Sequence, residues 1–506
     1  MKTKFSRTVS GPAVFIFMLF GINKIAAQTA TDALRYSSVQ LSGTARTIGV
    51  GNTTGALGGD FSAISINPAG IATYRRSEFE ISGGYYGANT NSILLSGGTN
   101  ASLSELNEKA TFNNIGLVLA SQPWSGGDWK TSNFAIGYNR LADFNRTIYY
   151  SGNSAGSLVT VFENQANQAS FDALGNQLAF DTQAIFDTTI NGQKQVFSDF
   201  TSNPNATVHR SQTVSQTGGV GELVLSYGGN YRDKLSVGAT VGIPFVNYTY
   251  TNTYAEDNTP AQVKFFKNLQ YKDNYTTEGT GINLKIGAIY KVTPELRIGL
   301  AVHSPTVYAL NDVRNAFMNY TYTAKSKDYY NESQSPDYKT DYTITTPFKT
   351  IVNGAYLFGK NGFLSADAEF VNYAGARLRI TTPDTISQLS KADIKTYEAS
   401  VNSDIQAKYK AAMNFRLGGE LAFSVLRLRA GVNLFGSPNV GDNSYRNAYT
   451  LGLGFRGDNI FLDLAYRSEQ QNFGYQPYFA SDAARYVNVD VKNRVTSLVA
   501  TIGLKF

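Results

Sequence analysis

The sequence predicts an all-β fold, a transmembrane barrel of fourteen antiparallel strands. From residue 79 onward, it contains many stretches of eight to thirteen residues in which apolar side chains alternate with small or polar ones. Alternation with period two is typical of strands that have two unlike faces. The connections between these stretches are alternately short and long, as in bacterial outer-membrane barrels, which also have even strand numbers. Together these observations indicate a closed barrel rather than a soluble sandwich.

Fourteen strands are expected from this alternation. They cover residues 79–87, 112–120, 133–140, 222–230, 234–243, 281–291, 295–303, 350–358, 362–371, 411–420, 426–435, 447–456, 459–467 and 494–506. The short connections are 231–233, 292–294, 359–361, 421–425 and 457–458, with 121–132 of intermediate length. The long ones are 88–111, 141–221, 244–280, 304–349, 372–410, 436–446 and 468–493. We expect the long connections to be extracellular loops.

The two faces of these strands suit lipid on one side and a polar interior on the other. In 426–435, Leu426, Leu428, Ala430, Val432 and Leu434 oppose Arg427, Arg429, Gly431 and Asn433. Charge facing hydrocarbon costs about 2–4 kcal/mol near the bilayer midplane, so the charged row should face inward. The last strand ends in Phe506 and resembles the recognition signal of outer-membrane barrels. We therefore expect outer-membrane lipid and the outer-membrane assembly machinery as partners.

The composition removes several classes of function. The chain has 506 residues, no Cys and only two His, His209 and His303. Without Cys there is no thiolate nucleophile and no Cys-ligated metal, and two His supply almost nothing for a metal site, so no cofactor is expected. Four of the 44 basic residues precede residue 28, which leaves the remainder nearly balanced against 38 acidic ones. A nucleic-acid partner needs clustered Lys and Arg and is not expected.

The first 27 residues have the pattern of an export signal. Lys2, Lys4 and Arg7 precede an apolar run over 11–22, which small residues follow up to Ala27. A membrane-spanning helix needs about 20 apolar residues, and this run is shorter. The sequence therefore predicts a signal peptide over 1–27, cleaved after Ala27, and a protein of the outer membrane of a diderm bacterium.

A glycine-rich segment precedes the first strand. Residues 43–86 include Gly43, Gly49, Gly51, Gly55, Gly58 and Gly59, an Ala45-Arg46 pair and the run Asn67-Pro68-Ala69-Gly70. This segment resembles the N-terminal hatch of the FadL/TodX family of outer-membrane transport proteins. His303-Ser304-Pro305-Thr306 resembles a Ser-Pro element that closes a strand in that family. The resemblance implies a hatch over 28–78 that plugs a barrel formed by 79–506.

The same resemblance implies a transport function. It implies passive uptake of hydrophobic small molecules, either long-chain fatty acids or aromatic compounds, which outer loops capture and a wall opening at the third strand releases sideways. In the third strand here, Gly137, Asn139 and Asp143 could interrupt the pairing, because Gly often marks bulges within strands. An ordinary strand end explains these residues equally well. Relatives with this fold also serve as scaffold or shuttle components of protein-export complexes, which leaves an interaction role open. We expect a monomer.

Two further groups of residues have alternative interpretations. Apolar residues in the long connection 141–221 recur at helical spacing, and they could form either a collecting groove or a lid packed on itself. Lys285, Arg416, Arg427 and Arg429 would point inward, where one could bind a ligand carboxylate. Inward Asp367, Glu369, Glu420 and Asp463 make mutual ion pairing the plainer role.

Enzymatic activity is not expected. A barrel hydrolase would need a Ser and a His held together by a third group. His303 is adjacent to Ser304 only along the chain, and we expect it at a strand end near a membrane interface. His209 lies in a predicted outer loop.

Overall fold

The computed structural model describes residues 14–15, 30–96, 98, 100–122, 127–168, 171–190, 193–382, 390–478 and 487–506. The predicted signal peptide lies outside these ranges, except for a two-residue strand, β1 (Val14–Phe15), which pairs in parallel with Gly474 and Tyr475. Signal cleavage therefore stays a prediction. No helix in the described ranges is both long and apolar enough to span a bilayer.

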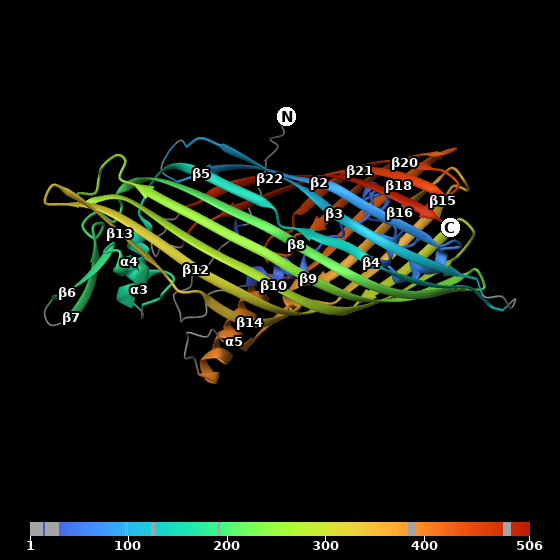
Figure 1. Cartoon of the computed structure of the whole chain (residues 1–506), viewed down its shortest axis with the longest axis horizontal. Coiled ribbons are helices and arrows are strands. Elements are labelled where there is room, and N and C mark those ends of the chain that lie inside the picture. Colours follow the sequence, from blue (N-terminus) through green and yellow to red (C-terminus); the bar gives the residue numbers. More distant parts are fainter. Residues whose placement is uncertain are drawn as a thin grey trace, which may run out of the picture.

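In the described part of the chain, fourteen antiparallel strands close into a barrel, as the alternation predicted (Figure 1). The ring closes where the first wall strand pairs with the last, from Glu78 opposite Lys505 to Leu94 opposite Val489. The wall strands are β2 (Glu78–Leu94), β3 (Leu103–Ser121), β4 (Trp129–Asp143), β8 (Thr207–Tyr231), β9 (Leu235–Asp257), β10 (Phe266–Lys291), β11 (Leu296–His303), β15 (Lys349–Leu357), β16 (Gly362–Asn372), β18 (Ala411–Phe423), β19 (Leu426–Gly436), β20 (Tyr445–Arg456), β21 (Ile460–Tyr475) and β22 (Val489–Lys505).

Many of the residues expected to form outer loops instead prolong the wall strands, which corrects the predicted bounds. β10 has 26 residues, although about 9–11 are enough to cross a bilayer. Four wall strands continue after a break as separate strands: β5 (Arg146–Ala155) follows β4, β12 (Val307–Ala324) follows β11, β14 (Tyr338–Thr345) precedes β15, and β17 (Arg377–Thr382) follows β16. Pro305 and Pro347 lie in two of these breaks, where a residue without an N–H cannot continue the ladder.

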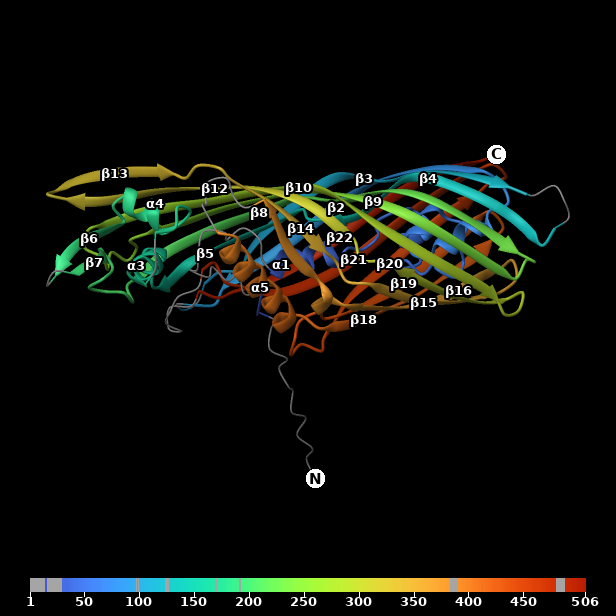
Figure 2. The same cartoon turned by 90° about the horizontal axis from the view of Figure 1, so that it is seen from below.

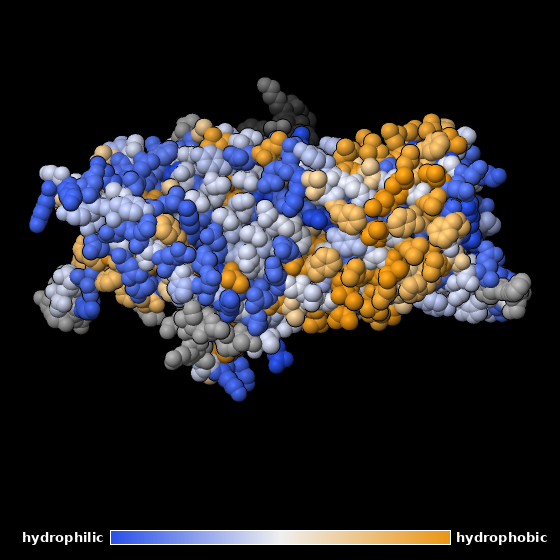
Figure 3. All heavy atoms as spheres, viewed as in Figure 1, coloured by the Kyte–Doolittle hydropathy of each residue, from blue (hydrophilic) through white to orange (hydrophobic). Residues whose placement is uncertain are grey.

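The outward face divides the barrel into two parts along its length. On the face that Figure 3 shows, an apolar band covers the part that contains the short turns, which we call the turn end, and a polar surface covers the part toward the other end, the loop end. Exposed apolar side chains of this band include Leu223, Leu225, Val241, Ile243, Phe245, Ile282, Leu284, Leu451, Leu453 and Ile502. The alternation therefore gives a lipid-facing surface only along part of each long strand.

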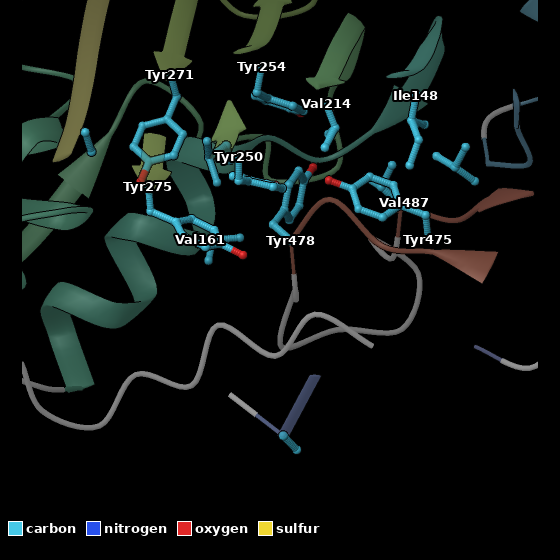
Figure 4. Packing of buried hydrophobic residues seen from close by; sticks show 14 of the residues in the cluster. Ile148, Val161, Val214, Tyr250, Tyr254, Tyr271, Tyr275, Tyr475, Tyr478 and Val487 are labelled. Carbon is cyan, nitrogen blue, oxygen red and sulfur yellow. The ribbon is translucent and has the colours of Figure 1, made fainter. Parts of the chain in front are cut away.

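The interior of the loop end is packed with tyrosine and aliphatic side chains. Figure 4 shows Tyr250, Tyr254, Tyr271, Tyr275 and Tyr478 among the side chains of this cluster. On β9 and β10, inward Tyr alternates with outward polar residues, so the period-two pattern continues beyond the apolar band with tyrosine inside. The loop end is therefore a filled extension of the barrel.

Helices and short strands cover the loop end. They are α3 (Leu158–Gln168), α4 (Asn176–Asp181), β6 (Ile185–Ile190), β7 (Gln193–Ser198) and β13 (Lys327–Gln334). In contrast, α5 (Lys391–Lys408) lies beside the barrel wall, and η3 (Tyr373–Gly375) packs against this helix. Leu158, Val161, Phe162, Leu178 and Ile185 are buried in the interior cluster, while Phe171 and Phe186 are exposed. Most of the apolar residues in 141–221 thus pack as a lid. Figure 2 shows α5 beside the barrel near α1 (Ala30–Ser37).

The N-terminal segment lies inside the barrel, where the resemblance predicted a plug (Figure 1). It contains α1, α2 (Ala45–Gly49), η1 (Phe61–Ser65) and η2 (Pro68–Thr73). We call residues 30–77 the hatch. Asp60 fixes its fold by accepting hydrogen bonds from Thr44 Oγ1 at 2.8 Å, Thr47 Oγ1 at 2.8 Å and Ser62 N at 2.9 Å. This buried carboxylate explains why an acidic residue follows Gly59.

Candidate functional site

A cavity of about 90 Å³ lies between the hatch and the wall. From the hatch it is lined by Tyr36, Gln40, Leu41 and Ile66, among others. The polar side chains that line it from the wall are Glu222, Asn283, Lys285, His303, Ser304, Thr306, Thr346, Lys349, Glu369 and Arg416. Apolar and charged groups therefore meet in one cavity.

Three basic side chains form a row across neighbouring strands of this cavity. Lys285 of β10 is opposite His303 of β11, and His303 is opposite Lys349 of β15. Residues that are directly opposite in a sheet have adjacent side chains. His303 Nε2 lies 3.0 Å from the backbone oxygen of Ile66 in the hatch. His303 is the last residue of β11, as the predicted strand end requires, and its ring points into the barrel.

Most cations of the cavity are paired with carboxylates. Lys285 Nζ forms an ion pair with Glu222, and Arg416 donates to Glu369 Oε2 at 2.9 Å. Lys349 also lines the cavity, but in the described part of the chain its ammonium has neither a hydrogen bond nor an ion pair. Two carboxylates thus face three basic side chains besides His303, and Lys349 is the one that forms no ion pair.

The four cations predicted as head-group contacts divide into two pairs. Lys285 and Arg416 line the cavity, whereas Arg427 and Arg429 belong to a separate network. Arg429 donates to Glu420 at 2.7 Å and to Asp463 at 2.5 Å, and Arg427 lies 3.6 Å from Glu420. The structure therefore brings only two of the four beside the cavity.

The predicted hatch motif fastens the hatch to the wall. Asn67 Oδ1 accepts from Ala69 N at 3.1 Å and so caps η2, while Asn67 Nδ2 donates to Asn353 Oδ1 at 3.1 Å. A Cβ on Gly238 of β9 would lie 2.4 Å from the Pro68 oxygen. Glycine at this wall position therefore allows the hatch backbone to approach closely. Gly70 packs similarly against Gly58 of the hatch.

The wall is interrupted at the third strand, where the sequence placed Gly137, Asn139 and Asp143. Pairing between β3 and β4 ends at Asn114 opposite Asn139. Beyond that point, β4 and its continuation β5 pair with β8 but, among the described residues, not with β3. The ladder between β4 and β8 shifts register between Arg140 and Ala142. We call the unpaired stretch that begins after Asn139, between β3 on one side and β4 and β5 on the other, the wall gap.

A short piece of the hatch lies along this gap. Gln40 N donates to Leu141 O and Ser42 N donates to Arg140 O, both at 2.9 Å. From the other side, Asn113 Nδ2 of β3 donates to Ser42 O at 3.0 Å. We call residues 40–42 the strap. The strap occupies backbone positions that β3 leaves unpaired, and Gln40 and Leu41 also line the cavity.

The three predicted third-strand residues have different surroundings. Asn139 Nδ2 donates to Ser65 Oγ at 2.9 Å, which ties the end of the β3–β4 ladder to the hatch. A Cβ on Gly137 would lie 2.4 Å from the Phe61 ring. Asp143 forms an ion pair with Arg140 and accepts from Asn145 Nδ2 at 3.0 Å. Gly137 and Asn139 therefore belong to the end of the paired ladder, and Asp143 lies within the gap.

Solved structures share this architecture. A FadL homologue of Pseudomonas aeruginosa matches over 92% of this chain and 98% of its own, with 14% identity and a TM-score of 0.50. The toluene transporter TodX of P. putida matches over 92% and 99%, with 12% identity and a TM-score of 0.52. The chain has the fold of the FadL and TodX channels. No family model and no curated protein matches the sequence.

Sequence reasoning missed Lys349 and the strap. Lys349 is one residue before the predicted strand 350–358, so the predicted inward face of that strand does not include it. Its register with His303 could have been found by extending that strand by one residue. The strap residues have no recognisable pattern, because their role depends on backbone hydrogen bonds to a strand about a hundred residues away.

Proposed function

We propose that this protein mediates passive uptake of hydrophobic small molecules, long-chain fatty acids or aromatic compounds, across the outer membrane of a diderm bacterium. The ligand is captured at the loop end, occupies the cavity and leaves sideways through the wall gap into lipid. One observation carries this proposal: the strap lines the cavity and also lies along the wall gap. Lateral exit keeps an apolar chain out of water, which is worth about 0.8 kcal/mol per CH₂.

Within this proposal, the charges of the cavity favour a ligand that carries a carboxylate. An unpaired ammonium is a strong partner for a carboxylate in a water-poor site. Lys349 is the primary contact, and Lys285 and Arg416 lie on the same cavity. Long-chain fatty acids therefore suit the site better than neutral aromatic compounds.

Locking the strap tests the exit route. The chain has no Cys, so a designed disulfide has no competing thiols. Ser42 Oγ and Asn113 Nδ2 are 3.2 Å apart, and the double variant S42C/N113C should fix the strap to β3. We expect uptake of a labelled fatty acid by cells to fall after oxidation and to recover with a reductant.

The matched control is a disulfide between the hatch and a wall strand that does not border the wall gap. Thr53 Oγ1 and Ser365 Oγ are 2.6 Å apart, and this contact joins the hatch to β16 rather than to the strands at the wall gap. Oxidised T53C/S365C should retain uptake. Unchanged uptake in a fully crosslinked S42C/N113C protein would show that the strap does not gate the exit.

A scaffold role in a protein-export or assembly complex is the second candidate. The filled interior of the loop end favours it, because α3 and α4 pack as a lid rather than as an open groove. Native purification in mild detergent, followed by mass spectrometry, separates the two functions. A bound amphiphile supports uptake, and a stoichiometric protein partner without bound lipid supports the scaffold role.

A further inference from the structure

A serine, a histidine and an asparagine are joined by hydrogen bonds on the outward face of the loop end. Ser151 Oγ of β5 lies 2.9 Å from His209 Nε2 of β8. His209 Nδ1 lies 2.8 Å from Asn153 Oδ1 of β5. The Asn153 oxygen can only accept, so it fixes the proton on Nδ1 and leaves Nε2 to accept from Ser151. The expected outer-loop position of His209 is corrected, because it lies within β8.

The sheet holds these side chains in place. Ser151 and Asn153 are two residues apart and so share one face of β5, and Asn153 is directly opposite His209. Asn153 N–H points away from β8, because it donates to Asn100 Oδ1 at 3.0 Å. The pair is therefore of the non-hydrogen-bonded kind, in which facing side chains lie closest.

The same ladder leaves a backbone donor beside Ser151. In an antiparallel ladder the direction of N–H groups alternates, so the N–H of Ser151 also points away from β8, toward the wall gap. Among the described residues, this N–H has no hydrogen-bond partner. A free N–H on the nucleophile's own residue is suited to stabilise an oxyanion that forms on a carbonyl attacked by its Oγ.

We propose that Ser151, His209 and Asn153 form the catalytic group of an acyl-ester hydrolase on the outer face of the barrel. As Ser151 Oγ bonds to the ester carbonyl carbon, its proton passes to His209 Nε2. The bond from that carbon to the alcohol oxygen then breaks, and His209 returns the proton to the leaving alcohol. Water next attacks the acyl-serine and gives a proton to His209. The acid leaves as Ser151 regains that proton.

The position of the group indicates where its substrate lies. Ser211, opposite Ser151, is twelve residues from the exposed Leu223 of the apolar band on the same strand, which is about 40 Å along the strand. The ester is therefore presented from the extracellular side and not from within the bilayer. Thr213 and Thr253 face each other on the adjoining outward surface, and their hydroxyls suit a hydroxylated alcohol portion.

A serine-reactive fluorophosphonate probe and p-nitrophenyl acetate test this activity with the full-length protein in detergent. We expect the wild type to be labelled at Ser151 and to hydrolyse the ester. S151A should abolish both, and H209Q should slow both by about 10²–10⁴-fold, the usual contribution of a general base. N153D should retain activity, because a carboxylate can also accept from Nδ1.

Ser211 supplies the matched control. It is the register partner of Ser151 on the same outward face, but no hydrogen bond joins it to His209 in the described structure. S211A should be labelled like the wild type, and heat-dependent gel migration should show that every variant is folded. Equal rates for wild type and S151A would overturn the proposal, as would an equal loss in S211A.

Discussion

At the scale of single residues, charge pairing distinguishes the cations of the barrel interior. Lys285, Arg416, Arg427 and Arg429 each have a carboxylate partner. Breaking such a buried pair leaves an uncompensated charge and is strongly destabilising. Among the described residues Lys349 forms no ion pair or hydrogen bond with a carboxylate, although its charge attracts that of Glu369, so its replacement tests ligand binding without breaking such a pair.

We expect K349M to weaken binding of a long-chain carboxylate about 10- to 100-fold, since a hydrogen bond to a charged group is worth about 1.5–3 kcal/mol. Titration with a fluorescent fatty acid measures the effect. The neutral methyl ester should bind equally to both proteins. K360M, in an exposed turn, serves as the control. An equal loss for acid and ester would contradict the assigned carboxylate contact.

The close approach of the hatch to Gly238 gives a second prediction. A Cβ there would lie 2.4 Å from the Pro68 oxygen, so G238A must displace the hatch backbone. We expect a loss of about 1–3 kcal/mol in the free energy of unfolding, as for other overpacked sites, measured by denaturant titration. In G354A the nearest atom would be 4.0 Å away, and this variant should be unaffected. Similar free energies of unfolding for G238A and G354A would show that the hatch backbone moves away from an added Cβ without a loss of stability.

At the scale of elements, the hatch is the main filling of the turn end. Its side chains and backbone bond to several wall strands, for example through Thr131 Oγ1 to Ala72 O at 2.8 Å. Deletion of residues 28–75 should open a water-filled lumen, because barrels of this class conduct when nothing plugs them. Conductance across a planar bilayer measures this, and an unchanged conductance would refute the plug assignment.

Helix α5 covers an edge of the wall that has no neighbouring strand among the described residues. Among the described residues, β17 pairs with β14 on one side only. Along its other edge, Leu378 N donates to Asn402 Oδ1 at 2.9 Å and Ile380 N donates to Glu398 Oε1 at 2.7 Å. Side chains of α5 thus satisfy backbone groups that would otherwise form an exposed edge.

At the scale of the whole molecule, the apolar band fixes the position in the membrane. Val241 and Thr251 face outward on the same strand, one within the band and one beyond it. V241R should cost about 2–4 kcal/mol of unfolding free energy in lipid vesicles, whereas T251R should cost close to nothing. Equal losses of unfolding free energy in V241R and T251R would show that the apolar band does not mark the lipid-facing surface.

The sequence by itself determined the barrel, its strand number and its inner and outer faces. A period-two pattern depends only on neighbouring residues, and lipid on one face enforces it along every strand. It also indicated ion pairing of the interior charges, because opposite signs occur on inward positions of adjacent strands. These properties are local, so they can be read without knowing the tertiary structure.

Only the tertiary structure decided which cation remained unpaired, where the strap met the wall gap, and that Ser151 and His209 were neighbours. Each of these facts joins residues that are distant along the chain, and each depends on strand register and on the packing of the hatch. A shift of one residue would have turned Lys349 outward and separated Ser151 from His209, because the side-chain period of a strand is two.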